Sequence, residues 1–310
     1  MSATPAAPAA KPAVSLSSDS LSGERLRERL FELLMLLALL MALGFLVILV
    51  YDIVSSALPV LQDRGMSFLT EKLSNRMSRT GLSQALVGSL QIAMMTAVVA
   101  FPLGIATAIY LEEYTDGTWF TRLVDINVRN LAGVPSIVYG LLGFAIFVRF
   151  LQPLTGGRTA LSAGLTLGLL ALPIVVITAA ESIRAVPMSL REGGYGLGAT
   201  RWQVTRRLVL PSAAPGMLTG MILALARAIG ETAPLLVVGA ATFLTTEAAV
   251  TALREPFTAL PVVVFQWAKV PRREFVEQAA PAAILVLLVF TLSMNGLAIW
   301  LRNRYEKRNA

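Results

Sequence analysis

The sequence contains no cysteine and no histidine among its 310 residues. Disulfides and thiol chemistry are therefore excluded, and so are histidine acid–base catalysis and the usual zinc sites. Charged residues are also scarce, at 15% of the chain, whereas soluble domains carry about 25%. Hydrophobic residues make up 55%. This balance is typical of a chain that lies largely in a membrane, and we predict neither catalytic residues nor a metal site.

Long apolar runs recur along the chain. A run of about 20 residues can cross about 30 Å of hydrocarbon as a helix. Such runs lie at 31–58, 86–110, 131–151, 161–183, 215–242 and 280–301. They predict an all-α, polytopic membrane bundle with about six transmembrane helices. A cleaved signal peptide is the alternative for the first run, but the apolar part of such a peptide has only about 7–15 residues and lies near the start.

The runs divide the chain into segments. We expect a disordered arm at 1–29, rich in Ala, Pro and Ser, and a first transmembrane helix at 30–58. An extracytoplasmic loop at 59–85 would lead to a core of five transmembrane helices at 86–301. Within the core we expect a cytoplasmic loop at 184–211 and an extracytoplasmic loop at 243–279, and a short cytoplasmic tail at 302–310 would follow the core. A short helix around 258–267 would lie at the outer interface, at a depth that suits Trp267.

The net charge of +7 indicates orientation rather than nucleic-acid binding. The basic residues are scattered through loops and helix flanks, where they set topology and contact anionic lipid. With a cytoplasmic N-terminus, 15 of the 26 Lys and Arg residues fall on the cytoplasmic side. This bias favours both termini in the cytoplasm.

The predicted loop at 184–211 carries a glycine-rich motif. The run 191–203 reads REGGYGLGATRWQ, and Leu210-Pro211 closes the loop. Small residues allow close approach to a partner, Trp202 offers an apolar anchor, and the arginines can meet carboxylates. The candidate residues are Glu192, Gly193, Gly194, Gly198, Ala199, Trp202 and Pro211. The alternative is a basic loop that only fixes topology.

Two charged residues lie inside the predicted fifth span. Arg227 and Glu231 are four residues apart and would share one helix face, with the small residues Gly216, Gly220 and Ala224 continuing that face. A charge in hydrocarbon is costly, so such residues face a partner or a water-filled path. An arginine fork can grip a tetrahedral oxyanion. We therefore predict a substrate path at Arg227, Glu231 and Thr232, with a structural ion pair between subunits as the alternative.

Two prolines indicate irregular helices. Pro234 would kink the fifth span near Gly230. Pro135 disfavours helix at Val134, so the third span would start near Ser136. Its free N–H groups and the Ser136 hydroxyl could face an anion, or the bend could serve packing alone.

The motifs resemble those of a known family. The loop around Glu192 is similar to the signature loop of ATP-binding-cassette (ABC) importer permeases, although that family usually has Ala-Ala where this chain has Gly193-Gly194. The segments 108–114, 131–140, 227–234 and 258–261 with Trp267 resemble the A-type permease subunits of bacterial phosphate ABC importers.

The resemblance implies a type I ABC importer permease in the bacterial inner membrane, moving inorganic phosphate into the cytoplasm. It also implies three kinds of partner: a second, C-type permease, two ATP-binding ATPase subunits, one of them docked on the loop around Glu192, and an extracytoplasmic phosphate-binding protein. This chain would bind no cofactor, because it has no Gly-Lys pair and hence no phosphate-binding loop for ATP. A permease for sulfate, molybdate or phosphonate, or an ATP-independent anion transporter, remains the alternative.

Overall fold

The computed structural model describes residues 18–115, 117–241 and 252–309, with the backbone alone for 18–26 and 305–309. The described residues form helices and no strands. Five helices are long and apolar enough to cross a membrane, and a sixth span results if one bent pair is counted as a single crossing. The predicted all-α membrane bundle is thereby confirmed.

The chain divides into two compact units, residues 1–52 and 53–310. The first unit holds most of helix α1 (Ser18–Arg64). We expected a disordered arm up to residue 29, but the helix begins at Ser18; residues 1–17 lie outside the described residues. Glu24, Arg25 and Arg27 favour helix, so the helix extends well before the apolar run.

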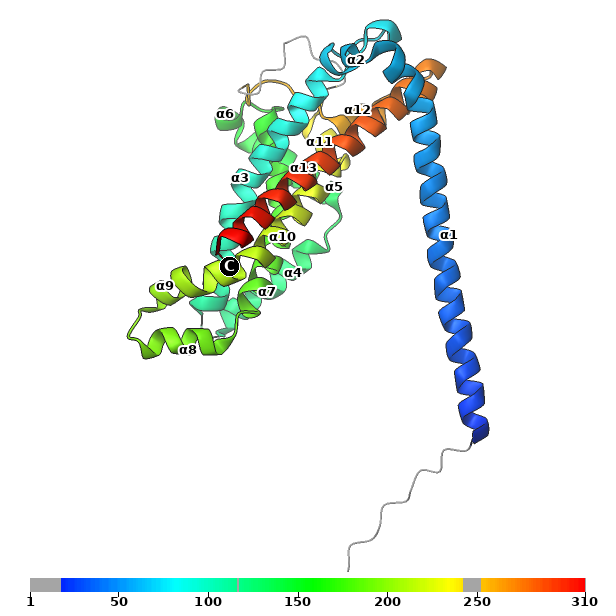
Figure 1. Cartoon of the computed structure of the whole chain (residues 1–310). Helices are drawn as coiled ribbons and strands as arrows, with labels where there is room; N and C mark the ends of the chain where they lie inside the picture. Colours follow the sequence, from blue (N-terminus) through cyan, green and yellow to red (C-terminus); the bar gives the residue numbers. More distant parts are fainter. Residues whose placement is uncertain (1–17, 116, 242–251, 310) are drawn as a thin grey trace, which may run out of the picture. The chain divides into compact units, whose positions relative to one another are not determined.

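The second unit holds the remaining helices. Figure 1 shows α8 and α9 at one end of this unit and α2, α6 and α12 at the other. Its elements are α2 (Met66–Thr70), η1 (Met77–Arg79), α3 (Ser83–Glu113), α4 (Trp119–Ala132), α5 (Ser136–Gly143), η2 (Phe144–Phe150), α6 (Gln152–Thr155), α7 (Ala160–Arg184), α8 (Met188–Gly196), α9 (Arg201–Val204), η3 (Thr205–Val209), α10 (Leu210–Gly230), α11 (Ala233–Val238), α12 (Leu260–Trp267), η4 (Phe275–Ala279) and α13 (Ala280–Asn309).

Helix α7 lies at the centre of this unit and packs against α3 and α10. Small residues permit the contact, since helices in hydrocarbon associate through close packing rather than through hydrophobicity. At Gly220 of α10 an added Cβ atom would lie 2.1 Å from the Thr178 hydroxyl oxygen of α7. The backbone of α10 therefore approaches α7 more closely than any other residue type would allow.

The predicted third span is broken. Helices α4 and α5 meet at an angle of 106°, because Pro135 prevents the helix from continuing through Val134. The second helix starts at Ser136, as predicted. The Tyr139 hydroxyl donates a 2.8 Å hydrogen bond to the Leu131 carbonyl across the break. The same carbonyl also accepts the Val134 N–H at 3.0 Å, so the Tyr139 bond adds a side-chain tie across the break.

The predicted fifth span is also broken, more completely than the expected kink. Helix α10 ends at Gly230, and Glu231 is extended, with φ −75° and ψ 121°. The chain turns helical again in α11, where Pro234 lies in the first turn. Proline suits that position because its missing N–H would have no helical partner there.

Helix α12 confirms the short helix that we predicted outside the spans, but not its placement. Trp267 is only 3% exposed and packs between Phe68 and Phe275, with ring centroids 6.3 Å and 5.7 Å away. Trp267 therefore packs inside the protein, and its depth at the outer interface stays a prediction.

The close contact between α7 and α10 predicts the effect of a single methyl group. Gly220→Ala forces its Cβ atom into Thr178 and should cost about 1–3 kcal/mol, the range for overpacked sites. Gly296→Ala in α13 is the matched control, since nothing lies within 4 Å of its added Cβ atom. Thermal unfolding in detergent should show a lower Tm for Gly220→Ala alone, and equal Tm values would contradict the packing described here.

Candidate substrate path and coupling loop

The charged pair of the predicted path lies where α10 ends. Arg227 occupies the last turn of α10, and its Nε atom is 3.7 Å from Glu231 Oε1. The Arg227 side chain is 55% exposed and that of Glu231 is 19% exposed. Ala228, the next residue, is buried. Arg227 therefore points away from the packing of its own chain, toward whatever lies beside it in the membrane.

Two broken helices meet at this pair. Helix α11 packs against α5, so closely that an added Cβ atom on Gly140 would lie 2.8 Å from Pro234 Cα. Tyr139 of α5 is near enough to Arg227 for the two side chains to interact electrostatically. Sequence reasoning missed Tyr139 as a neighbour of the pair. Its position one turn after the predicted helix start was the available signal.

The other predicted path residues lie beside this junction. Ser136 begins α5 and is half-buried, and Thr232 stands between α10 and α11 and is also half-buried. The structure thus brings Arg227 and Glu231 together and places Thr232 next to them in the chain. Ser136 is linked to the pair through α5 and Tyr139 rather than by a direct contact.

The small residues of α10 face another way than predicted. Gly216 and Gly220 contact Ser182 and Thr178 of α7, and Ala224 is fully buried. Positions four apart stay on one helix face, so this stripe continues to Ala228 and not to Arg227. The prediction that these residues border the path was wrong, because they form the contact with α7.

The predicted loop at 184–211 contains a short helix pair, α8 and α9. The turn between them uses Gly198 at φ +79°, where other residues are strained. The Thr200 side chain and Gln203 form a reciprocal cap at the start of α9. Pro211 sits in the first turn of α10, and Ala199 packs against the apolar cluster at the base of the loop.

The loop exposes apolar side chains at its tip. Trp202 is 52% exposed and Leu197 is 91% exposed, while Glu192 beside them is also exposed. Sequence reasoning named Trp202 and Glu192 but missed Leu197. An exposed tryptophan and leucine around a carboxylate form a surface that can anchor a partner.

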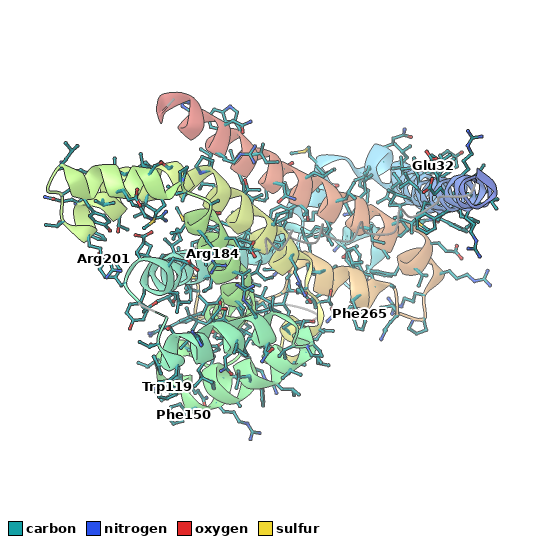
Figure 2. All side chains as sticks on the ribbon, turned by 90° about the horizontal axis from the view of Figure 1, so that it is seen from below. Glu32, Trp119, Phe150, Arg184, Arg201 and Phe265 are labelled. Atoms are coloured by element: carbon teal, nitrogen blue, oxygen red, sulfur yellow. The ribbon has the colours of Figure 1, made fainter. Side chains whose placement is uncertain are left out.

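The cations at the base of the loop reach toward the end of α3. Arg184 bonds the Glu112 carboxylate, and the Arg201 guanidinium lies 5.6 Å from the centre of the Tyr114 ring. Figure 2 shows both arginines at this end of the molecule. Among the described residues no group of three or more carboxylates gathers in a way that could hold a metal ion.

The membrane-length helices define an integral membrane protein. The chain belongs to the family of binding-protein-dependent transport system inner membrane components, whose sequence profile matches residues 77–308.

The curated relatives agree in name. The chain is 36% identical over 218 residues to the phosphate transport system permease protein PstA of Yersinia pestis, covering 70% of this chain and 71% of that one. It is 46% identical over 157 residues to PstA of Mycobacterium leprae, and this match spans 51% of this chain and only 50% of the relative. The probable PstA of Methanocaldococcus jannaschii is 29% identical, over 92% of this chain and 95% of that one.

Solved structures show the same fold. A chain of the MetNI methionine ABC transporter, in an inward-facing conformation, aligns with a TM-score of 0.58 at 16% identity, over 72% of this chain and 95% of that one. An amino acid ABC transporter aligns with a TM-score of 0.52 at 18% identity, over 72% and 93%. The predicted type I ABC importer permease architecture is confirmed.

Two adjacent glycines of α8 should respond differently to alanine. Nothing lies within 4 Å of an added Cβ atom on Gly193, whereas on Gly194 it would lie 2.9 Å from both Leu208 and Val204. Gly193→Ala should therefore stabilise α8 by about 0.5–1 kcal/mol, and Gly194→Ala should destabilise the helix pair. Hydrogen exchange of the α8 amides measures both effects. Faster exchange in the Gly193 variant would show that the helix is not held as described.

Proposed function

We propose that this chain is the A-type permease subunit of an ABC importer that moves inorganic phosphate into the cytoplasm, with ATP hydrolysed by separate subunits. The family and the PstA relatives support the class of transporter and its cargo. The observation that carries the assignment to a site is the exposed Arg227 at the broken end of α10.

Arg227 is the group that contacts the passing anion. Its guanidinium donates several hydrogen bonds in a planar fork that matches a tetrahedral oxyanion. Glu231, 3.7 Å away, holds the guanidinium when the path is empty. The same carboxylate repels phosphate, which keeps binding weak enough for release. Thr232 and Ser136 supply hydroxyl groups along the same stretch of the path.

The exposure of Arg227 fits a path between two subunits. A charged side chain cannot face lipid without a large cost, so a second, C-type permease covers this face and completes the path. An extracytoplasmic phosphate-binding protein delivers the cargo. We place both termini in the cytoplasm, because this orientation puts the α8–α9 loop on the cytoplasmic side, where the ATPases lie.

The α8–α9 loop is the docking site for one of two ATPase subunits. Trp202 and Leu197 enter an apolar groove on the ATPase, and Glu192 meets a cation at its rim. The small residues Gly193 and Gly198 leave room for close approach. ATP is bound by those partners, so this chain needs no cofactor of its own.

A permease for sulfate, molybdate or phosphonate is the nearest alternative, because a guanidinium fork accepts any tetrahedral oxyanion. Competition by each anion against phosphate uptake separates these cargoes. An ATP-independent anion transporter would require phosphate flux through the purified chain alone.

Removal of Arg227 should abolish transport without dissociating the complex. In proteoliposomes holding the whole importer, Arg227→Ala should reduce uptake of radiolabelled phosphate by about 100-fold or more, since losing one partner of a buried charged contact costs about 2–5 kcal/mol. Arg227→Lys keeps the charge but not the fork, so its phosphate uptake should lie between that of the wild type and that of Arg227→Ala. ATP hydrolysis should persist.

The matched control is Arg129→Ala. Arg129 and Asp125 form another pair four residues apart, on α4, at 3.1 Å and with both side chains more than 40% exposed. This variant should transport at nearly the wild-type rate. Wild-type uptake by Arg227→Ala would refute the assigned role.

Reversal of the charge at Glu192 should release the ATPase from the permease. Glu192→Lys places a cation where a cation of the ATPase is expected, and like charges at an interface cost several kcal/mol. Co-purification of the ATPase with the permease measures the effect. The control is Glu277→Lys, the same change at an exposed acid of η4. Equal recovery of the ATPase with both variants would count against docking at Glu192.

A further inference from the structure

Helix α3 ends in a buried carboxylate. Glu113 is its last residue, and the side chain is only 3% exposed. A carboxylate at a helix C-terminus is opposed by the helix dipole, and burial adds a desolvation cost. A specific partner must offset both effects.

The partner comes from the α8–α9 loop. Arg191 of α8 donates to Glu113 Oε1 from Nε at 3.1 Å and from Nη2 at 2.9 Å. The same guanidinium donates to the Ile183 carbonyl at 2.8 Å and to the Val186 carbonyl at 2.6 Å. Those carbonyls lie at the end of α7 and just beyond it. One side chain of the loop thus holds the ends of both α3 and α7.

The α8–α9 loop is joined to α7 and α10 through the backbone, but not to α3. The loop continues directly from α7 and into α10, so any movement of it reaches those helices through the backbone. Helix α3 has no such connection, because it ends 75 residues before α8 begins. Its remaining charged tie, Arg184–Glu112, leaves the Arg184 side chain 57% exposed, and exposed pairs hold weakly.

Apolar packing at this end joins α3 to α7 and η3, and the Thr205 hydroxyl of η3 donates to Glu113 Oε2 at 3.5 Å, but the ion pair is the contact that ties α8 itself to the end of α3. An open cavity of about 570 Å³ lies next to it, with Glu113, Arg191, Tyr195 and Arg201 among its lining residues. Water in such a cavity transmits no force between α8 and α3. The buried pair is therefore the stiff element that joins them.

We propose that Glu113 and Arg191 form the link that carries movement of the α8–α9 loop to α3. Both are positioning residues, and the proposal rests on the proposed function, in which an ATPase moves this loop. A buried ion pair is not required for stability, because apolar residues of similar size often serve as well. Its fixed geometry instead joins the loop and α3 into one body.

The test uses the complete importer in proteoliposomes and the variant Glu113→Gln, which keeps the size of the side chain and removes its charge. Two quantities are measured: phosphate imported per ATP hydrolysed, and the ATP-dependent change in the labelling rate of a single cysteine introduced as Ala226→Cys, beside Arg227. The chain has no other cysteine. Glu113→Gln should hydrolyse ATP but lower the import ratio by about 5- to 100-fold, the range of coupling between sites, and reduce the labelling change.

Two further variants separate the link from general stability. Glu112→Gln removes the neighbouring carboxylate of the exposed pair and should change both quantities by less than about twofold. Arg191→Lys keeps the charge but cannot donate to Glu113, Ile183 and Val186 together, so it should behave like Glu113→Gln.

A covalent rescue covers the case in which the buried charge change harms folding. In a complex whose other subunits lack cysteine, Glu113→Cys with Arg191→Cys is joined by a short, reducible thiol crosslinker. The crosslinked form should recover the ratio of phosphate imported to ATP hydrolysed. Reduction of the crosslinker should lower this ratio again. This rescue is measured without the Ala226→Cys label.

The outcomes distinguish the two proposals. Wild-type import and labelling by Glu113→Gln, or no gain on crosslinking, overturns the link. If the wild-type complex hydrolyses ATP and shows the labelling change but imports no phosphate, the proposed cargo is wrong and the labelling comparison still decides the link.

Discussion

A backbone polar group left free in hydrocarbon costs several kcal/mol, and this constraint decides where the chain can interrupt its spans. Both interruptions obey it. At the first, the Tyr139 hydroxyl bonds the Leu131 carbonyl across the bend. At the second, the Glu231 N–H bonds the Ala228 carbonyl, and α11 resumes with a proline that has no N–H to satisfy. The two breaks lie side by side because α11 packs on α5. Irregular backbone and the charged pair are thereby gathered in one place.

The centre and the two ends of the second unit are each held by a different kind of interaction. The centre relies on small residues, as at Gly220, where α10 and α7 meet backbone to side chain. The α8–α9 end relies on a cluster of alanine and branched side chains, with the buried Glu113–Arg191 pair above it. The opposite end holds the aromatic contacts of Trp267 with Phe68 and Phe275. The ion pairs and caps of this unit thus gather where helices end, because unpaired backbone groups are found there.

Much of the fold could be predicted from the sequence, and the errors have one physical origin. Hydropathy located the spans that became α3 and α7 to within a few residues, and it located the start of α13; Pro135 located the start of α5. Hydropathy gives no direction to a side chain. The stripe from Gly216 to Ala224 was therefore assigned to the path, although a residue three positions on, Arg227, is turned by about 60° from it. Hydropathy likewise does not show that Phe68 and Phe275 enclose Trp267.

The sequence by itself determined that this is a membrane bundle, that a charged pair lies within it, and that an exposed loop ends in an apolar anchor. These properties depend on residues near one another in the chain. The tertiary structure alone decided that Tyr139 comes within electrostatic reach of Arg227, that α10 stops before Glu231, and that Glu113 pairs with Arg191 of a helix that begins 75 residues later. Such contacts depend on how helices pack, and the direction of packing is set by all their side chains together.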